Sequence, residues 1–141
     1  MNLSEMNLDI IPSMEYIPCM EWQVLLDKEF SLWLRGQDID LRKEIAAHSE
    51  LLKQYGPMLG RPRVDTVKGS RFPNMKELRI QWKGQPWRML FAFDPKRRSV
   101  LLLGGNKQGD KRWYEKNVPV ADVRYEKHLR RMEKDNGNKV R

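Results

Sequence analysis

The stretch from residue 77 to residue 114 constrains the fold most, because it holds three strand-like segments joined by very short links. Residues 77–82 and 87–93 place apolar side chains at every second position, and residues 99–103 form a continuous apolar run. The links between them contain glycine, proline and charged residues, which is typical of turns. Since these links are too short for helical crossovers, we expect an antiparallel three-stranded sheet.

Alternation along the first two strands also separates charged from apolar side chains. In the first strand Leu78 and Ile80 share one face and Arg79 lies on the other, and in the second strand Arg88 lies opposite Met89. Because the two strands are consecutive, we expect Arg79 and Arg88 side by side on one sheet surface. Solvated arginines on a polar face and a paired anion-binding site both fit this pattern.

The chain is strongly basic, with 27 Lys and Arg against 19 Asp and Glu and a formal net charge of +8. The excess lies mainly in residues 96–98, 107–116 and 124–134, where aromatic side chains are interspersed. Such a balance attracts polyanions: nucleic acid, the ribosome, an acidic protein or an anionic membrane surface. A basic surface that is merely solvated is the alternative to a binding function.

Composition narrows the class of protein further. Hydrophobic residues make up 40% of the 141 residues, which is enough for one domain with a packed core. No apolar run approaches the roughly 18 residues of a membrane span, and the N-terminus does not have the pattern of a signal peptide. Cys19 is the only cysteine, so an internal disulfide is excluded, and with only His48 and His128 beside it we expect no zinc site. We therefore expect a cytoplasmic protein without a membrane segment.

Two amphipathic helices are predicted ahead of the strands. Asp27 is a good N-cap for a helix over residues 28–34, and Asp38 is one for a longer helix over residues 39–54. Residues 22–26, directly before them, fit either a short strand or the first turn of a helix. The two helices form a hairpin whose apolar faces need a sheet to cover.

Two features admit both a structural and a chemical interpretation. His48 lies close to the apolar stripe of the second helix, where a packing histidine is commoner than a catalytic one. Residues 104–111 are rich in Gly and Lys, but they lack the Walker spacing and the GxGxxG context of nucleotide-binding loops. We interpret them as a flexible strand end that presents Lys107, Lys111 and Arg112.

The ends of the chain complete the predicted organisation. Pro119 is expected to open a final helix over residues 120–133. Residues 1–19 form an N-terminal extension that we expect to be flexible, and residues 20–134 form the single compact domain. Residues 135–141 are expected to form a frayed basic tail.

The order of these elements and several short motifs resemble the RelE/ParE superfamily of bacterial toxins, and most closely its phage-derived HigB-type branch. The likeness extends from about residue 20 to residue 133. The segments that carry it are VKGSR at 67–71, NMKELR at 74–79, WRMLFAFDP at 87–95, LLLGGNK at 101–107, WYEK at 113–116, PVAD at 119–122, and Tyr125.

The resemblance implies an α+β, RelE-like fold, with an N-terminal helical hairpin packed on a small antiparallel sheet and a C-terminal helix. It implies the toxin of a toxin–antitoxin system, a metal-independent endoribonuclease (mRNA interferase) that cuts messenger RNA in the ribosomal A site and inhibits translation. The implied partners are a cognate helix-turn-helix antitoxin, the ribosome and messenger RNA. Neither a small-molecule cofactor nor a membrane partner is expected.

Cleavage by the neighbouring 2′-hydroxyl requires a base, a stabiliser of the phosphorane charge and an acid. Arg88 is the first candidate, because it matches the family's aromatic-Arg pattern and its fork fits two phosphate oxygens. The full set of catalytic candidates is Arg88, Arg79, Lys107 and Tyr114. The candidate RNA contacts are Lys68, Arg71, Lys111, Arg112 and Trp113.

Each candidate has a structural alternative, as a solvated strand residue, a loop cation or a packing aromatic. No acidic residue stands out as the base. His128 is expected to be exposed on the final helix, so the histidine that some family members use is not assigned to it. At the level of function, a ParE-like toxin that inhibits DNA gyrase and a non-catalytic RNA or protein binder are alternatives, since one fold can carry all three.

Overall fold

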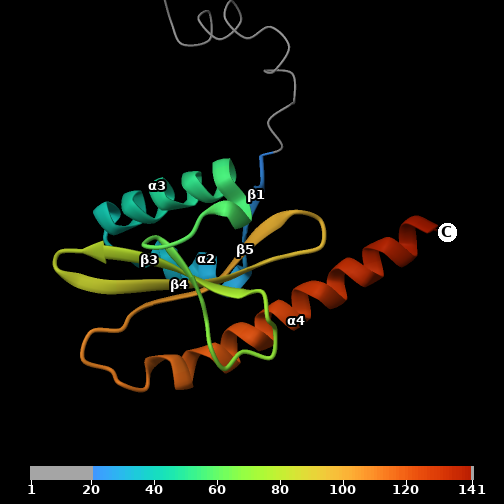
Figure 1. Ribbon diagram of the computed structural model, residues 1–141. Coiled ribbons are helices and arrows are strands. Elements are labelled where there is room, and N and C mark those ends of the chain that lie inside the picture. Colours follow the sequence, from blue (N-terminus) through green and yellow to red (C-terminus); the bar gives the residue numbers. More distant parts are fainter. Residues whose placement is uncertain (1–20, 141) are drawn as a thin grey trace, which may run out of the picture.

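The computed structural model of the protein describes residues 21–140, with side chains as far as residue 137. The predicted N-terminal extension, residues 1–19, lies outside the described residues. Five strands form one sheet in the order β1-β5-β4-β3-β2, with helices on both of its faces (Figure 1). The predicted α+β class is therefore confirmed.

The three central strands form the predicted antiparallel meander. β3 (Met75–Trp82), β4 (Gln85–Phe93) and β5 (Arg98–Asn106) are neighbours in the sheet in chain order. Lys83 and Gly84 link β3 to β4, and both have positive φ, as the favoured two-residue hairpin turn requires. This tight turn fixes the register between the two strands.

The sheet is larger than predicted, because a short strand is added at each edge. β1 (Gln23–Leu26) pairs in parallel with β5, so the sheet is mixed rather than purely antiparallel. β2 (Val64–Thr66) pairs antiparallel with β3, within a connection expected to be irregular. Strands this short show no clear alternation in a sequence, and their pairing is decided by distant parts of the chain.

α2 (Lys28–Arg35) and α3 (Ile39–Tyr55) form the predicted helical hairpin over one face of the sheet. Asp27 accepts hydrogen bonds from two backbone N–H groups in the first turn of α2, and Asp38 accepts one at the start of α3. Both predicted N-caps are therefore confirmed. The core between the hairpin and the sheet consists of Phe30, Leu41, Ile45, Leu52, Val64, Leu78, Ile80, Met89, Phe91 and Leu101.

α4 (Trp113–Val140) crosses the opposite face of the sheet (Figure 1). The second core, between α4 and the sheet, includes Met75, Leu90, Ala92, Val100, Leu102, Trp113, Val118, Ala121 and Tyr125. Both faces of the central strands are thus buried. The buried polar side chains on these strands are Glu77, Arg88 and Ser99, and Arg88 Nε and Ser99 Oγ have no hydrogen-bond partner among the described residues.

The final helix starts earlier than the sequence predicts. It begins at Trp113, so Pro119 lies inside the helix instead of opening it. Pro119 removes one backbone donor, which disturbs the hydrogen bonds of the preceding turn. The carbonyl that loses its helical donor is that of Glu115; the Asn117 side-chain amide donates to a different carbonyl, that of Trp113, at 2.7 Å.

The same helix also ends later than predicted. It continues past residue 133 to Val140, so the segment expected to be a frayed tail is helical as far as Val140. Extending a helix that already exists costs little per residue, even where few side chains pack against the rest of the protein. Among residues 21–140, no helix is both long enough and apolar enough to cross a membrane.

Candidate functional site

Arg79 and Arg88 lie directly opposite each other on β3 and β4, as the alternation predicts. The two side chains differ in exposure: 33% of the Arg79 side chain is exposed, whereas only 7% of the Arg88 side chain is exposed. Arg88 Nη1 donates to the Trp87 carbonyl at 3.0 Å, while its buried Nε has no hydrogen-bond partner among the described residues. The interpretation of Arg88 as a solvated surface cation is therefore wrong.

A buried carboxylate that the sequence analysis missed completes this pair. Glu77 lies two residues before Arg79, on the same face of β3. Its Oε1 is 3.8 Å from Arg79 Nε, and its Oε2 is 3.8 Å from Arg88 Nε. The two-residue spacing from Arg79 is the sequence signal that places Glu77 beside both arginines.

Tyr114, in the first turn of α4, donates its hydroxyl hydrogen to Glu77 Oε2 at 2.6 Å. Burial of the phenol, together with the hydrogen bond to the Glu77 carboxylate, raises the pKa of Tyr114 above its ordinary value. Tyr114 therefore keeps its proton at neutral pH and is a hydrogen-bond donor in this site.

Lys107 follows the end of β5, where its backbone N–H donates to the Pro86 carbonyl at 3.0 Å. Its Nζ lies 5.6 Å from the centre of the Tyr114 ring. Arg79, Arg88 and Tyr114 are thus brought together around one carboxylate, and Lys107 lies beside the Tyr114 ring. We call Glu77, Arg79, Arg88, Lys107 and Tyr114 the charged cluster.

Two hollows adjoin the charged cluster. The first, of about 290 Å³, is lined by Glu77, Tyr114 and residues 65–68, and we call it the Tyr114 hollow. It brings Lys68, a predicted RNA contact, to the catalytic candidates. The second, of about 430 Å³, lies where β3 extends past its pairing with β2. We call this second hollow the edge cleft; it is lined by His48, Pro62, Arg63, Arg79, Ile80, Gln81 and Arg88.

The remaining predicted RNA contacts lie elsewhere or are engaged by other groups. Arg71 Nη2 is 2.9 Å from Glu126, on α4, and its backbone N–H donates to Asp122 at 2.9 Å. Lys111 and Arg112 are exposed before α4 begins. These residues are not part of either hollow that adjoins the charged cluster.

Trp113 is a core residue, which corrects its prediction as an RNA contact. Its side chain is buried in the core beneath α4. The indole packs so closely on β5 that a Cβ placed on Gly105 would lie 2.9 Å from the Trp113 Nε1. A base cannot stack on this ring while it is packed in the core.

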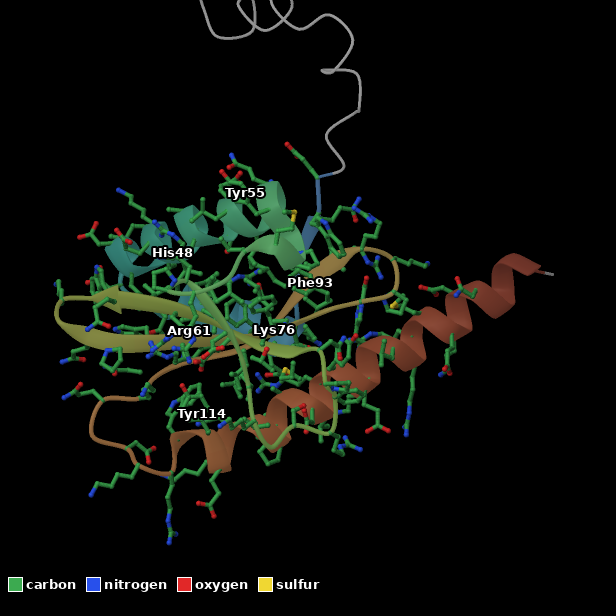
Figure 2. The ribbon with its side chains drawn as sticks, in the orientation of Figure 1. His48, Tyr55, Arg61, Lys76, Phe93 and Tyr114 are labelled. Carbon is green, nitrogen blue, oxygen red and sulfur yellow. The ribbon has the colours of Figure 1, made fainter. Side chains whose placement is uncertain are left out.

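His48 and His128 contact different groups. His48 is half-buried on α3, and its Nδ1 lies 2.8 Å from the Glu44 carbonyl. Since a carbonyl only accepts, Nδ1 carries the hydrogen, and Nε2 is the ring nitrogen that remains for another contact. Figure 2 shows His48 on α3, above the sheet, and Tyr114 at the start of α4, below it.

His128 is a structural residue rather than an exposed one. Its Nε2 lies 2.9 Å from Oδ2 of Asp94, whose side chain is fully buried. Burial would raise the pKa of Asp94, but hydrogen bonds from His128 and Arg98 outweigh that effect and hold the pKa below its ordinary value. This arrangement fixes the turn between β4 and β5 to α4.

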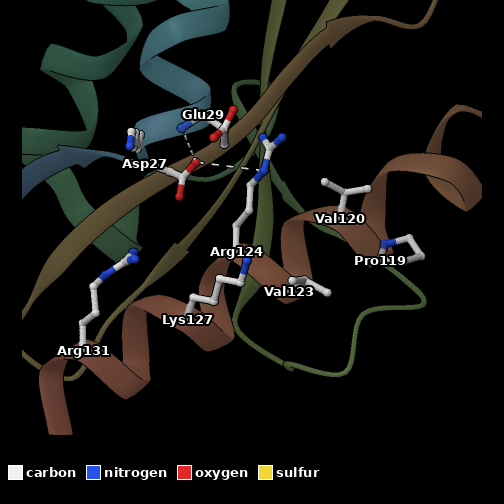
Figure 3. A pocket seen from close by; sticks show the side chains of 9 residues that line it. Asp27, Glu29, Pro119, Val120, Val123, Arg124, Lys127 and Arg131 are labelled. Carbon is white, nitrogen blue, oxygen red and sulfur yellow. Dashed lines mark hydrogen bonds and ion pairs between the residues drawn. The ribbon is translucent and has the colours of Figure 1, made fainter. Parts of the chain in front are cut away.

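A further hollow lies between the start of α2 and α4, away from the charged cluster (Figure 3). Its volume is about 520 Å³, and its walls include Asp27, Val120, Val123, Arg124 and Lys127. None of the predicted site residues lines it. Separately, among the described residues no group of three or more His, Cys, Asp or Glu side chains is placed to hold a metal ion.

Comparison with known proteins gives one family and two curated relatives. The family of phage-derived, Gp49-like proteins (DUF891) matches residues 32–126. A Mycobacterium tuberculosis protein named "Putative toxin HigB3" is 47% identical over 107 residues, which cover 75% of this chain and 92% of that protein. A second protein of the same organism, "Putative toxin HigB2", is 41% identical over 131 residues, which cover 84% of this chain and 65% of that protein.

Among solved structures, a mutant of the E. coli toxin RelE in the free state covers 68% of this chain and 94% of its own, with a TM-score of 0.47 and 11% sequence identity. A likeness of this size supports no conclusion by itself. The family match is different, because residues 32–126 contain α3, strands β2 to β5 and the whole charged cluster. The predicted HigB-type relationship is confirmed, and the chain belongs to the Gp49-like family of phage-derived proteins.

Proposed function

We propose that this protein is the toxin of a toxin–antitoxin pair and that it cuts messenger RNA on the ribosome as a metal-independent endoribonuclease. The observation that carries the proposal is one carboxylate in contact with two arginines and a phenol. Glu77 lies 3.8 Å from each guanidinium Nε and 2.6 Å from the Tyr114 hydroxyl. The toxin names of two relatives and the net charge of +8 support it.

The charged cluster contains a group for each step of the proposed cleavage. Glu77 takes the proton of the 2′-hydroxyl, and that oxygen attacks the adjacent phosphorus. The arginines stabilise the negative charge of the phosphorane. The bond to the 5′-oxygen then breaks, and Tyr114 or Lys107 gives this oxygen a proton, which leaves a 2′,3′-cyclic phosphate and a 5′-hydroxyl.

Exposure suggests different roles for the two arginines. Arg79, with 33% of its side chain exposed, is the guanidinium that an incoming phosphate reaches first. Arg88, which is almost completely buried, holds Glu77 in place and adds positive potential from within the sheet face. The sequence favoured Arg88 as the phosphate contact, whereas the accessible surface favours Arg79.

The proposed partner that silences the toxin is a cognate helix-turn-helix antitoxin. An acidic or amphipathic segment of that antitoxin would cover the cationic face and exclude RNA from it. We expect the complex to be markedly weaker at about 1 M salt than at low salt, because screening acts on charges at a surface. Equal affinity at both salt concentrations would argue against a mainly electrostatic contact.

The alternative functions lack comparable support. Inhibition of DNA gyrase rests on membership of a broad superfamily, and no contact among the described residues specifically favours it. In a non-catalytic binder the contact between Glu77 and Tyr114 would serve only to neutralise Arg79 and Arg88 and to fix α4. The cleavage proposal accounts for that contact, because it needs a base and an acid close together.

Primer extension on a reporter message tests the proposal, with purified protein in the presence and absence of programmed ribosomes. We expect cuts only with ribosomes, and we expect Arg79→Ala to lower the cleavage rate roughly 10²–10³-fold, as loss of a charge-stabilising group does. Lys96→Ala, which removes the same charge from the exposed β4–β5 turn, is the matched control. Intact message in all lanes with folded wild-type protein would overturn the nuclease proposal.

A further inference from the structure

We propose that the edge cleft is a second RNA subsite, which binds phosphate groups of the message strand next to the scissile bond. The inference rests on the proposed function and extends it to residues that neither the sequence motifs nor the charged cluster include. These are Arg63, from the segment before β2, Gln81, from β3, and His48, from α3. The ligand chemistry is a ribose–phosphate backbone.

Charge is the first argument for this assignment. Three arginines line the edge cleft, from three different segments of the chain: Arg63, Arg79 and Arg88. Glu77 forms ion pairs with Arg79 and Arg88, while Arg63 has no ion pair among the described residues. The cleft therefore keeps an excess of positive charge, which is concentrated in a hollow rather than spread over a convex surface.

An unsatisfied donor is the second argument, and it is independent of net charge. Arg88 Nε is buried and has no hydrogen-bond partner among the described residues. Buried donors in folded proteins are nearly always paired, and an unpaired one is unfavourable until an acceptor reaches it. A phosphate oxygen in the cleft is an acceptor of the right charge for a guanidinium.

The third argument comes from His48. Its Nδ1 donates to the Glu44 carbonyl, so Nε2 is the ring nitrogen that is left for a ligand in the cleft, and it is an acceptor when the ring is neutral. A ribose 2′-hydroxyl is a donor, and it is the group by which a protein distinguishes RNA from DNA. Arginine and histidine together thus match the phosphate and the sugar of one nucleotide.

The position of the cleft fits a strand that is cut at the charged cluster. Along β3, Glu77 lines the Tyr114 hollow, and Arg79 and Gln81 line the edge cleft. A message whose scissile phosphate lies at Arg79 therefore has a hollow in each direction along β3. The edge cleft receives the neighbouring phosphate on one side of the cut.

The test measures binding rather than cleavage. Programmed ribosomes carry a message with a single 2′-O-methyl group, on the nucleotide whose hydroxyl would attack at the cut that primer extension locates, so that the neighbouring 2′-hydroxyls remain available to the cleft. We expect Arg63→Ala to weaken binding about tenfold. It should also reduce the slope of the logarithm of the binding constant against the logarithm of salt concentration by about one, the contribution of one phosphate contact. Gln81→Glu, which puts a carboxylate in the cleft, is expected to weaken binding at least as much. Lys96→Ala should stay within about twofold of wild type, since it removes a charge far from the cleft.

The outcomes separate this inference from the proposed function. If wild-type protein cuts unmodified message but Arg63→Ala and Gln81→Glu bind as wild type, the cleft assignment is overturned and the nuclease stands. If wild-type protein binds but never cuts, the nuclease proposal is overturned, while the binding of the two variants still tests the assignment of the cleft. If Arg63→Ala weakens binding equally on ribosomes without an A-site codon, the ligand is ribosomal RNA, and the assignment to the message is overturned. Thermal unfolding of both variants confirms that they are folded.

Discussion

Glu77 determines how the charges of the cluster balance. Like charges directly opposite each other on neighbouring strands are destabilising, and Arg79 faces Arg88 across β3 and β4. The Glu77 carboxylate lies 3.8 Å from both and so offsets that repulsion. The same carboxylate is the proposed base, which means that a test of its chemistry has to leave the fold intact.

Glu77→Gln is the substitution that separates these roles, because the amide keeps the size of the side chain and removes its charge. We expect the cleavage rate on programmed ribosomes to fall about 10²–10⁴-fold, the usual effect of removing a general base. The free energy of unfolding should decrease by about 1–3 kcal/mol, because Arg88 loses a charged partner in a buried site. A single-turnover rate within threefold of wild type would exclude Glu77 as the base.

Tyr114 gives the protein a predictable response to alkaline pH. Burial and Glu77 raise its pKa in the folded state, so the folded protein holds this proton more tightly than the unfolded chain does. The resulting stability is complete below the ordinary tyrosine pKa of about 10 and is lost as pH rises through the higher, folded value. We expect Tyr114→Phe to have a shallower loss of stability as pH rises above about 10 in denaturant titrations.

The slope should not disappear in Tyr114→Phe, because burial also raises the pKa of Tyr125. Identical alkaline slopes in wild type and variant would mean that Tyr114 does not hold its proton more tightly in the fold. The variant also separates stability from chemistry. A large loss of cleavage at neutral pH, where Tyr114 is protonated in both states, would come from its role as a donor.

At the scale of elements, the glycine pair of β5 explains how helices approach both faces of one strand. A Cβ on Gly104 would collide with the Trp33 ring of α2, and one on Gly105 would lie 2.9 Å from Trp113 of α4. The pair belongs to the strand itself and serves close packing, whereas the sequence suggested a flexible strand end. Because residues 104 and 105 have no side chain, Trp33 can pack against one face of β5 and Trp113 against the other.

Gly104→Ala should therefore destabilise the protein by about 1–3 kcal/mol, because the indole of Trp33 cannot withdraw without opening the core. Gly60→Ala is the matched control: its added Cβ meets no atom within 4 Å, and a change within about 0.5 kcal/mol is expected. Urea denaturation of both variants provides the measurement. Equal stabilities would show that α2 can shift away from β5 at little cost.

The β4–β5 turn is held by one buried aspartate. Asp94 Oδ1 accepts from the backbone N–H groups of Lys96 and Arg98, and Oδ2 accepts from Arg98 Nε and His128 Nε2. Because its pKa is lowered in the fold, its contribution is present above the ordinary carboxyl pKa and is lost as pH falls through the lower folded value.

Asp94→Ala is expected to reduce the free energy of unfolding by about 3–5 kcal/mol, since it removes a buried carboxylate and leaves two backbone donors, His128 and the partly exposed Arg98 guanidinium without their partner. Asp65→Ala, which breaks the exposed pair with Arg61, should reduce it by less than about 1 kcal/mol. Thermal unfolding at neutral pH measures both. Similar losses in the two variants would contradict the structural role assigned to Asp94.

Local signals explain which elements the sequence predicts. The caps Asp27 and Asp38 and the alternation around Arg79 and Arg88 act within a few residues, so they identify helices, strands and faces directly. For residues 22–26 the sequence left a strand and a helical turn as alternatives; the strand is correct, but its partner β5 lies too far along the chain for local signals to decide. Glu77 was missed for a related reason: its hydroxyl partner, Tyr114, lies on a different element.

At the scale of the whole molecule, the end of α4 projects beyond the sheet (Figure 1). Met132 is the last buried residue that the structure describes, and residues 133–137 are exposed. Deletion of residues 134–141 should therefore change the free energy of unfolding by no more than about 0.5 kcal/mol. It should also leave translation arrest intact. A loss of more than about 2 kcal/mol would show that this end packs against the domain.

The parallel pairing of β1 with β5 has a consequence for when the proposed toxin becomes active. The sheet cannot close until residues 98–101 have been made, and its second face stays open until α4 follows. Contacts between segments so far apart in the chain form late in folding. The charged cluster lies on strands of this sheet and takes Tyr114 from α4, so a ribosome still synthesising this protein carries a growing chain that cannot yet assemble the cluster. The proposed toxin therefore stays inactive until translation of its own message is nearly finished.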